Sequence, residues 1–159
     1  LLELLYGCGL RASELVGLRE ADIDLEGGLV RCIGKGDKER VVPMGSHAVE
    51  AVRRYLRDGR RQLLHGRRSE HLFLNARGGH LTRQGLDYLL RRYVVKAGLE
   101  KHASAHTFRH SFATHLIESG TDIRTVQELL GHASVETTMI YTHVLGKGGR
   151  GVTSPLDGR

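Results

Sequence analysis

The sequence predicts an α+β fold that is mainly α-helical and holds one small antiparallel sheet of about three strands. Apolar residues recur at helical spacing along most of the chain, whereas residues 23–42 alternate apolar and polar side chains between glycine-rich turns. With 159 residues, of which 40% are hydrophobic and 26% charged, the chain has the length and composition of one globular domain.

Local signals place each element. Glycines end the first helix, and a glycine-rich hairpin at residues 34–38 joins the second and third strands. Thr82 is a suitable N-cap for a helix that Gly98 closes and that turns Leu86, Leu89, Leu90 and Tyr93 inward. The expected helices cover residues 1–5, 13–18, 46–63, 82–96, 107–118, 122–130 and 135–145, and the expected strands cover residues 23–25, 29–33 and 40–42. Because the chain starts with leucines in mid-helix, we expect an N-terminally truncated fragment.

Charge is concentrated in the middle third of the chain. Residues 46–101 carry thirteen basic and five acidic side chains. The net charge of the whole chain is +6, so all of its positive excess lies in this segment. Such a stretch is typical of a protein that binds a polyanion, most often nucleic acid, although for a charge run alone a solvated helix face is the favoured interpretation. The two cysteines lie in apolar stretches, and no segment has the length of a membrane span. We therefore expect a cytoplasmic protein without a membrane partner.

Five polar motifs could form a site. His106 and Arg109 share the face of a helix near its start, where free N–H groups favour an anion. Taken singly, each motif has a plainer interpretation: solvent exposure for Arg11 and Lys35, and half-buried packing for Tyr141. A zinc site at His106, His110 and His115 is a weaker alternative, because no CxxC pair or carboxylate accompanies these histidines.

Taken together, the motifs resemble a known family. In order they are the segment around Arg11 (residues 5–15), the hairpin segment Gly34-Lys35-Gly36-Asp37-Lys38-Glu39-Arg40, His106-Thr107-Phe108-Arg109, Leu130-Gly131-His132 and Tyr141. This set is similar to the catalytic domain of the tyrosine recombinases, the phage-integrase and Xer family, over nearly the whole chain. The body resembles an Xer recombinase and the C-terminal tail an integron integrase, although residues 69–82 leave little room for the helical insertion of integron integrases. Ala105 stands where the family often has proline.

The resemblance implies the chemistry. Tyr141 would attack a DNA phosphodiester and form a 3′-phosphotyrosyl link, with no metal, ATP or other cofactor. A tyrosine of pKa about 10 is only about 0.1% ionised at pH 7, so His106 would act as its base. Arg11 and Arg109 would bind the negative charge of the transition state, as guanidiniums do for phosphates. Lys35 would protonate the leaving 5′-oxygen and His132 would hydrogen-bond a non-bridging oxygen.

The resemblance also implies the domains and partners. Residues 1–145 would form the catalytic domain and residues 146–159 a flexible tail. The partner would be double-stranded DNA, bound by a homotetramer on two duplexes that exchanges C-terminal segments. The residues expected to contact DNA are Arg53, Arg57, Arg60, Thr82, Arg83, Gln84 and Arg91. Two alternatives remain: DNA relaxation of the type IB topoisomerase kind, and a DNA-binding remnant without activity that would bind in a salt-sensitive manner.

Overall fold

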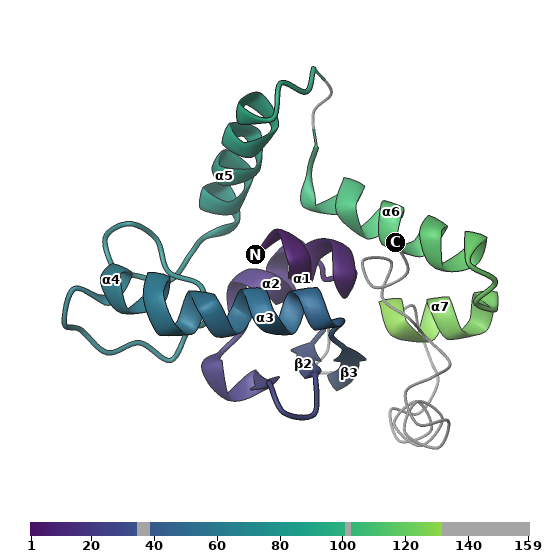
Figure 1. Cartoon of the computed structure of the whole chain (residues 1–159), viewed down its shortest axis with the longest axis horizontal. Coiled ribbons are helices and arrows are strands. Elements are labelled where there is room, and N and C mark those ends of the chain that lie inside the picture. Colours follow the sequence, from purple (N-terminus) through teal and green to yellow (C-terminus); the bar gives the residue numbers. More distant parts are fainter. Residues whose placement is uncertain (35–38, 101–102, 132–159) are drawn as a thin grey trace.

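The computed structural model describes residues 1–34, 39–100 and 103–131. Within these ranges the chain is mainly helical with one three-stranded antiparallel sheet, as the sequence predicts (Figure 1). The helical elements are α1 (Leu2–Gly7), α2 (Ala12–Gly17), the 3-10 turn η1 (Glu20–Asp22), α3 (Ser46–Arg54), the π-helical turn η2 (Tyr55–Gly59), α4 (Arg60–Leu64), α5 (Arg83–Lys96), α6 (Ala105–Glu118) and α7 (Ile123–Leu130). The strands are β1 (Ile23–Asp24), β2 (Leu29–Ile33) and β3 (Glu39–Pro43). The helix expected at 135–145 lies outside the described residues.

The sheet confirms the predicted alternation. Its strands run in the order β1-β2-β3, and β2 pairs with β3 so that Val30 faces Val42 and Cys32 faces Arg40. Side chains alternate between the two faces of a strand, so Arg40 and Val42 of β3 share one face. Both residues are buried, which brings one charged side chain into the interior beside the apolar ones.

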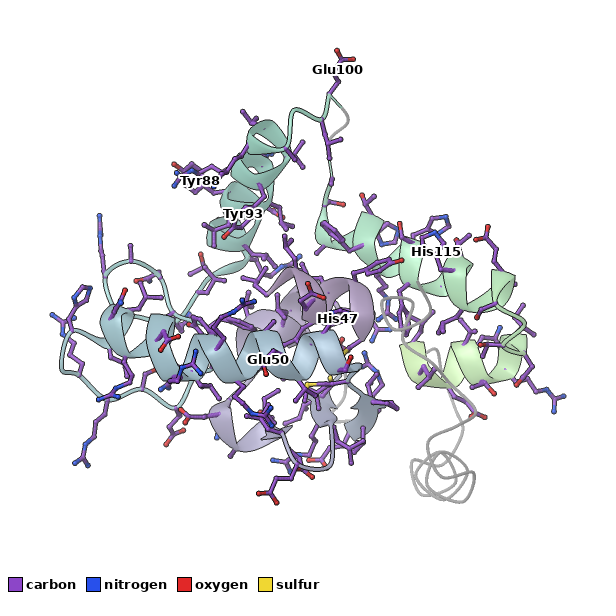
Figure 2. All side chains as sticks on the ribbon, in the orientation of Figure 1. His47, Glu50, Tyr88, Tyr93, Glu100 and His115 are labelled. Carbon is purple, nitrogen blue, oxygen red and sulfur yellow. The ribbon has the colours of Figure 1, made fainter. Side chains whose placement is uncertain are left out.

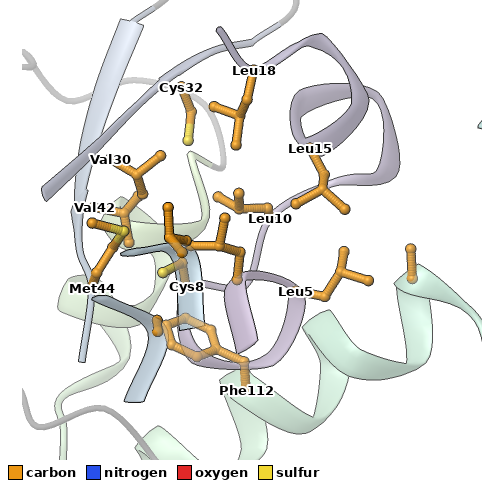
Figure 3. Close-up of a cluster of buried hydrophobic side chains, with 14 of the residues drawn as sticks. Leu5, Cys8, Leu10, Leu15, Leu18, Val30, Cys32, Val42, Met44 and Phe112 are labelled. Carbon is orange, nitrogen blue, oxygen red and sulfur yellow. The ribbon is translucent and has the colours of Figure 1, made fainter. Parts of the chain in front are cut away.

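The core joins α1, α2, the sheet and α6 around one cluster (Figure 3). Its buried members include Leu5, Leu10, Leu15, Leu18, Val30, Val42, Met44 and Phe112. The two cysteines, Cys8 and Cys32, are free thiols inside this cluster, as their apolar surroundings in the sequence predict. Burial raises the pKa of both thiols, that of Cys32 to about 12, so neither ionises near neutral pH.

The expected single helix over residues 46–63 is interrupted by a π-helical turn. A π turn holds more residues than an α turn and therefore rotates the helix that follows it. Val52 of α3 is buried, as predicted, but beyond the turn it is Arg60 that faces the interior. The apolar spacing predicted the helix correctly but could not show the change of phase.

Helix α5 stands away from the body in Figure 1 and packs on α2. Thr82 caps it as predicted, since its Oγ1 accepts the N–H of Gly85 at 3.1 Å. Leu86 and Leu90 are buried, but Tyr93, which was expected inward, is 48% exposed. That prediction is wrong because no residue of α5 beyond Leu90 is buried, and Tyr93 lies on this outer part of the helix (Figure 2).

Helices α6 and α7 pack against each other, and α6 also packs on α1. Both were predicted, although α6 begins two residues earlier than expected, with Ser104 as its N-cap. Within the described ranges, none of the helices combines the length and the apolar composition that crossing a bilayer requires.

Gly9→Ala is expected to destabilise the chain by about 2 kcal/mol, the cost of a strained backbone together with overpacking. Gly9 has φ +59°, and a Cβ there would run into the ring of Phe112. Urea unfolding followed by circular dichroism measures the change. Gly17→Ala is the matched control, because a Cβ at this helical glycine meets nothing within 4 Å; equal effects of the two substitutions would contradict the steric argument.

Candidate active site

Arg11 is held in place by the start of α2. It is the N-cap residue of that helix, and its backbone N–H donates to Oε2 of Glu14 at 2.8 Å. Its Nη1 donates to Oε1 of the same carboxylate at 2.9 Å, and its Nη2 donates to the carbonyl of Gly131 at 3.2 Å. The side chain remains 37% exposed. Arg11 is therefore fixed on one side and open to a ligand on the other.

Arg109 reaches the same place from α6. It lies a little more than one turn into the helix, and only 7% of the residue is exposed. Its Nη1 donates to the carbonyl of Gly9 at 2.6 Å, and its Nη2 donates to the carbonyl of Leu130. Gly9 precedes Arg11 by two residues, so Arg109 ties α6 to the turn that carries Arg11.

A third guanidinium, that of Arg40, completes the group. Its Nη1 and Nη2 donate to the two carboxylate oxygens of Glu14, and its Nε donates to the carbonyl of Leu129 at 2.9 Å. Arg40, Arg109 and Arg11 thus bind three consecutive carbonyls, those of Leu129, Leu130 and Gly131. The last carbonyls of a helix lack partners within it and carry the negative end of its dipole. We name Arg11, Arg40 and Arg109 the arginine cluster.

The arginine cluster has an excess of positive charge. Arg11 and Arg40 both pair with one carboxylate, that of Glu14, whose side chain is 2% exposed, whereas Arg109 binds backbone carbonyls. Burial by itself would raise the pKa of Glu14, but hydrogen bonds and charge from Arg40, helped by Arg11, lower it to about 2. Burial lowers the pKa of Arg109 to about 10, and the like charges of Arg11 and Arg40 act in the same direction. An anion placed against Arg11 and Arg109 would relieve this repulsion.

The structure brings Arg11 and Arg109 together, and it puts His106 one helical turn before Arg109. His106 is exposed near the start of α6, so its imidazole is accessible to a ligand. Lys35, His132 and Tyr141 lie outside the described residues. Gly131, which precedes His132, has φ +63° and ends α7 against the arginine cluster.

The residues expected to contact DNA divide into two groups. Arg53, Arg57, Arg91, Thr82, Arg83 and Gln84 are all exposed. Thr82, Arg83 and Gln84 line a hollow between α2 and the start of α5. The other residues that line it are Val16, His80, Leu81 and Asp87. Arg53 and Arg57 each pair with an acidic side chain on the same helical segment, at 3.5 Å and 2.9 Å.

Arg60 has a different role from the expected one. The residue is 7% exposed, and its guanidinium donates to the carbonyls of Ser69 at 2.6 Å and His71 at 2.9 Å and pairs with Glu20 at 2.8 Å. The π-helical turn causes this placement by rotating α4. Arg60 therefore holds the loop at residues 65–81 and is not part of the exposed basic surface.

The histidines named for the alternative zinc site, His106, His110 and His115, all lie on α6. Nδ1 of His115 forms a hydrogen bond with the hydroxyl of Tyr6 at 2.6 Å, and the two rings meet edge to face where α6 packs on α1 (Figure 2). In the part of the chain that the structure describes, no three His, Cys, Asp or Glu side chains are grouped as metal ligands would be.

Sequence reasoning did not assign Glu14 and Arg40, although both lie within the quoted motifs. The signals were present. Glu14 follows Arg11 by three residues, which puts both on one face at the start of a helix. Arg40 lies two residues before Val42, so both side chains share the buried face of the strand. A charged side chain is unusual on such a face.

The low pKa of Glu14 predicts acid sensitivity. A carboxyl whose pKa falls from 4.5 to about 2 on folding stabilises the folded state above about pH 4.5, and this contribution is lost as the pH falls toward 2. Glu14→Gln is expected to cost about 3 kcal/mol at pH 7, since it leaves buried guanidiniums without their carboxylate. Urea unfolding at pH 7, 5, 4 and 3 should show this difference shrinking toward the acid end.

The control for this prediction is Glu100→Gln, beyond the outer end of α5 and exposed (Figure 2). It should change the free energy of unfolding little at any pH. A constant difference between wild type and Glu14→Gln from pH 7 to pH 3 would contradict the account.

The fold and this site define a class: a mainly helical α+β domain in which arginines from three separate segments converge at one helix end. The sequence profile described as the phage integrase family matches residues 1–147, and the chain belongs to that family. It is similar to the tyrosine recombinase XerD of Corynebacterium glutamicum, with 55% identity over 144 residues, 91% of this chain and 47% of that protein. Its identity to the XerD of Halalkalibacterium halodurans is 51% over 144 residues, 91% of this chain and 48% of that protein.

Solved structures agree with the sequence relatives. A crystal structure of XerA recombinase matches with TM-score 0.76 and 37% identity, covering 93% of this chain and 53% of that one. A structure of XerH site-specific recombinase bound to difH in a pre-cleavage complex matches with TM-score 0.70 and 33% identity, covering 93% and 44%. The chain thus spans about half the length of the relatives it matches.

Proposed function

We propose that the chain is the catalytic domain of a site-specific DNA recombinase, which cleaves and rejoins DNA strands through a 3′-phosphotyrosyl intermediate without metal or ATP. The observation that carries this proposal is the arginine cluster. Two guanidiniums from separate parts of the sequence, Arg11 and Arg109, converge on the end of α7 with more positive charge than Glu14 balances. This is the environment that a phosphoryl transition state without a metal needs.

In the proposed reaction the hydroxyl oxygen of Tyr141 attacks the phosphorus, and the bond from phosphorus to the 5′-oxygen breaks. His106 accepts the phenol proton, and Lys35 gives a proton to the departing 5′-oxygen. Arg11 and Arg109 stabilise the charge on the non-bridging oxygens, and His132 hydrogen-bonds one of them. A free 5′-hydroxyl from a partner strand then reverses these steps. One phosphodiester replaces another, so no external energy source is required.

The exposed basic surface would position the duplex. Arg53, Arg57 and Arg91 would contact phosphates, which sets affinity and register. Thr82, Arg83 and Gln84 at the start of α5 would lie nearest the bases in the major groove. The match of the XerH structures, which are named as complexes with difH substrates, supports a DNA partner for this chain.

The proposal includes an assembly. We infer a catalytic domain over residues 1–145, a tail over residues 146–159, and a homotetramer on two duplexes in which each tail binds its neighbour, in the cytoplasm. The end of the family match at residue 147 supports the boundary. Mass photometry on DNA tests the tetramer: removal of residues 146–159 should leave binding of single protomers and abolish assemblies on two duplexes.

A nicked suicide substrate tests the function. The chain, alone and as a chimaera in which it replaces the matching part of a curated XerD relative, is incubated with this DNA in EDTA. A covalent protein–DNA adduct that resists denaturation should form and should be lost in Tyr141→Phe. Tyr88→Phe, on an exposed face of α5, is the matched control. Salt-sensitive binding without any adduct would instead identify a DNA-binding remnant.

A further inference from the structure

Arg40 is the most buried arginine in the part of the chain that the structure describes, with 5% of the residue exposed. The proposed mechanism does not use it. It lies on β3 beside Val42, on the face of the sheet that packs into the core. Burying a guanidinium there has a large desolvation cost, so its contacts must explain its presence.

All three nitrogens of the Arg40 guanidinium donate to the site. Nη1 and Nη2 bind the two carboxylate oxygens of Glu14, and Nε binds the carbonyl of Leu129 at 2.9 Å. The same carboxylate accepts the backbone N–H and Nη1 of Arg11 at 2.8 Å and 2.9 Å. Arg40 therefore fixes the acceptor that in turn fixes Arg11.

Arg40 also holds the end of α7. The Leu129 carbonyl that it binds directly precedes the carbonyls bound by Arg109 and Arg11. Gly131 packs against the same side chain: a Cβ on Gly131 would lie 3.1 Å from Cδ and 3.4 Å from Nε of Arg40. One side chain thus contacts both the partner of Arg11 and the turn that leads to His132.

Stability alone does not account for this arrangement. A buried ion pair is often no more stabilising than an apolar pair of the same volume, because desolvation offsets the attraction. What an apolar pair cannot supply is direction, since a planar guanidinium fixes the carboxylate in one orientation. Phosphoryl transfer depends on such orientation, and a misplacement of 1 Å costs about 10²-fold in rate.

We propose that Arg40 is a positioning residue, which orients Arg11 through Glu14 and the end of α7 through Leu129 so that Arg11 and Arg109 face one phosphate. It contacts no reacting atom. Its strand, β3, begins at Glu39, directly after residues 35–38, which lie outside the described ranges. The activity part of its test rests on the proposed function, whereas the spectroscopic part does not.

The variants are Arg40→Met, which keeps the length and volume, and Arg40→Lys, which keeps the charge but loses the forked hydrogen bonds. The double variant Arg40→Met with Glu14→Gln removes both buried charges, in case the single variant does not fold. The matched control is Arg31→Met in β2, whose half-exposed guanidinium pairs with Asp22 at 2.9 Å, away from the cluster. Circular dichroism and cooperative urea unfolding establish which variants are folded.

Single-turnover cleavage is measured on two suicide substrates, one with the natural phosphodiester and one with a neutral methylphosphonate at the cleavage position. Arg40→Met should bind DNA within about twofold of wild type and cleave the phosphodiester about 10²-fold more slowly. On the methylphosphonate, which has less charge for guanidiniums to stabilise, the loss should be below about fivefold. Arg40→Lys should recover about tenfold, and Arg31→Met should match wild type. Equal losses on both substrates, or no loss, would overturn the proposal.

A second measurement separates this inference from the proposed function. In wild type, the guanidinium 1H–15N signals of Arg11 and Arg109 should be sharp, since hydrogen bonds restrain both groups; in Arg40→Met the Arg11 signal should broaden or shift. If wild type forms no adduct, the proposed function fails and these signals decide the inference alone. Unchanged signals in a folded Arg40→Met would overturn it whatever the activity.

Discussion

Arg109→Lys is expected to reduce DNA cleavage by at least about 10³-fold while DNA affinity changes only a few fold. A lysine retains the positive charge but cannot donate to the carbonyls of Gly9 and Leu130 and also present a planar donor pair to a phosphate. Single-turnover adduct formation on the suicide substrate measures the rate, and fluorescence anisotropy at fixed salt measures affinity.

The matched control for Arg109→Lys is Arg124→Lys on α7, an exposed arginine on the neighbouring helix. It should cleave at the wild-type rate. Since Arg109 is buried, urea unfolding must accompany the assay; a folded Arg109→Lys that cleaves within tenfold of wild type would refute the assignment of its role.

Arg11→Lys is expected to lose a similar factor, about 10³-fold, with a smaller cost in stability. Its side chain is 37% exposed, and Arg40 still binds Glu14 when Arg11 is changed. A substitution at Arg11 therefore distinguishes a loss of cleavage rate from a loss of stability better than one at Arg109 does. Adduct formation and the urea midpoint should be measured on the same preparation.

Arg19→Lys provides the comparison for Arg11→Lys, because the exposed Arg19 only approaches Glu70, at 3.6 Å. It should resemble wild type in both measurements. A stable Arg11→Lys protein that forms adduct at an undiminished rate would show that the exposed side of Arg11 does not meet the phosphate.

Much of the fold could be predicted because its signals are local. Helix α7 begins where the side chain of Asp122 accepts the N–H groups of Arg124 and Thr125 at 3.0 Å and 3.1 Å, and it ends at Gly131 with φ +63°. The preference for a capping residue or a positive-φ glycine is set by the local backbone conformation, so it can be recognised from the sequence. The alternation of β2 and β3 is a local signal of the same kind.

The remaining features depend on contacts between distant segments. The π-helical turn rotates Arg60 inward, where its guanidinium donates to the carbonyls of Ser69 and His71. The apolar spacing of the helix cannot reveal these contacts with a distant loop. Tyr93 has an inward spacing on α5, but it is 48% exposed because none of the described elements covers that end of the helix. For the site, the ordered motifs predicted Arg11 and Arg109, whereas the roles of Glu14 and Arg40 emerge only from hydrogen bonds across 26 residues.

The central claim is that Arg11 and Arg109 jointly bind one phosphate, and titration with inorganic phosphate tests it without knowledge of the DNA target. The guanidinium 1H–15N signals of Arg11 and Arg109 are followed in wild type, and that of Arg11 is followed in Arg109→Lys. The account predicts that the two signals shift along one saturation curve, and that the Arg11 curve moves to at least tenfold higher phosphate in the variant. Separate curves, or an Arg11 curve indifferent to the loss of Arg109, would contradict it.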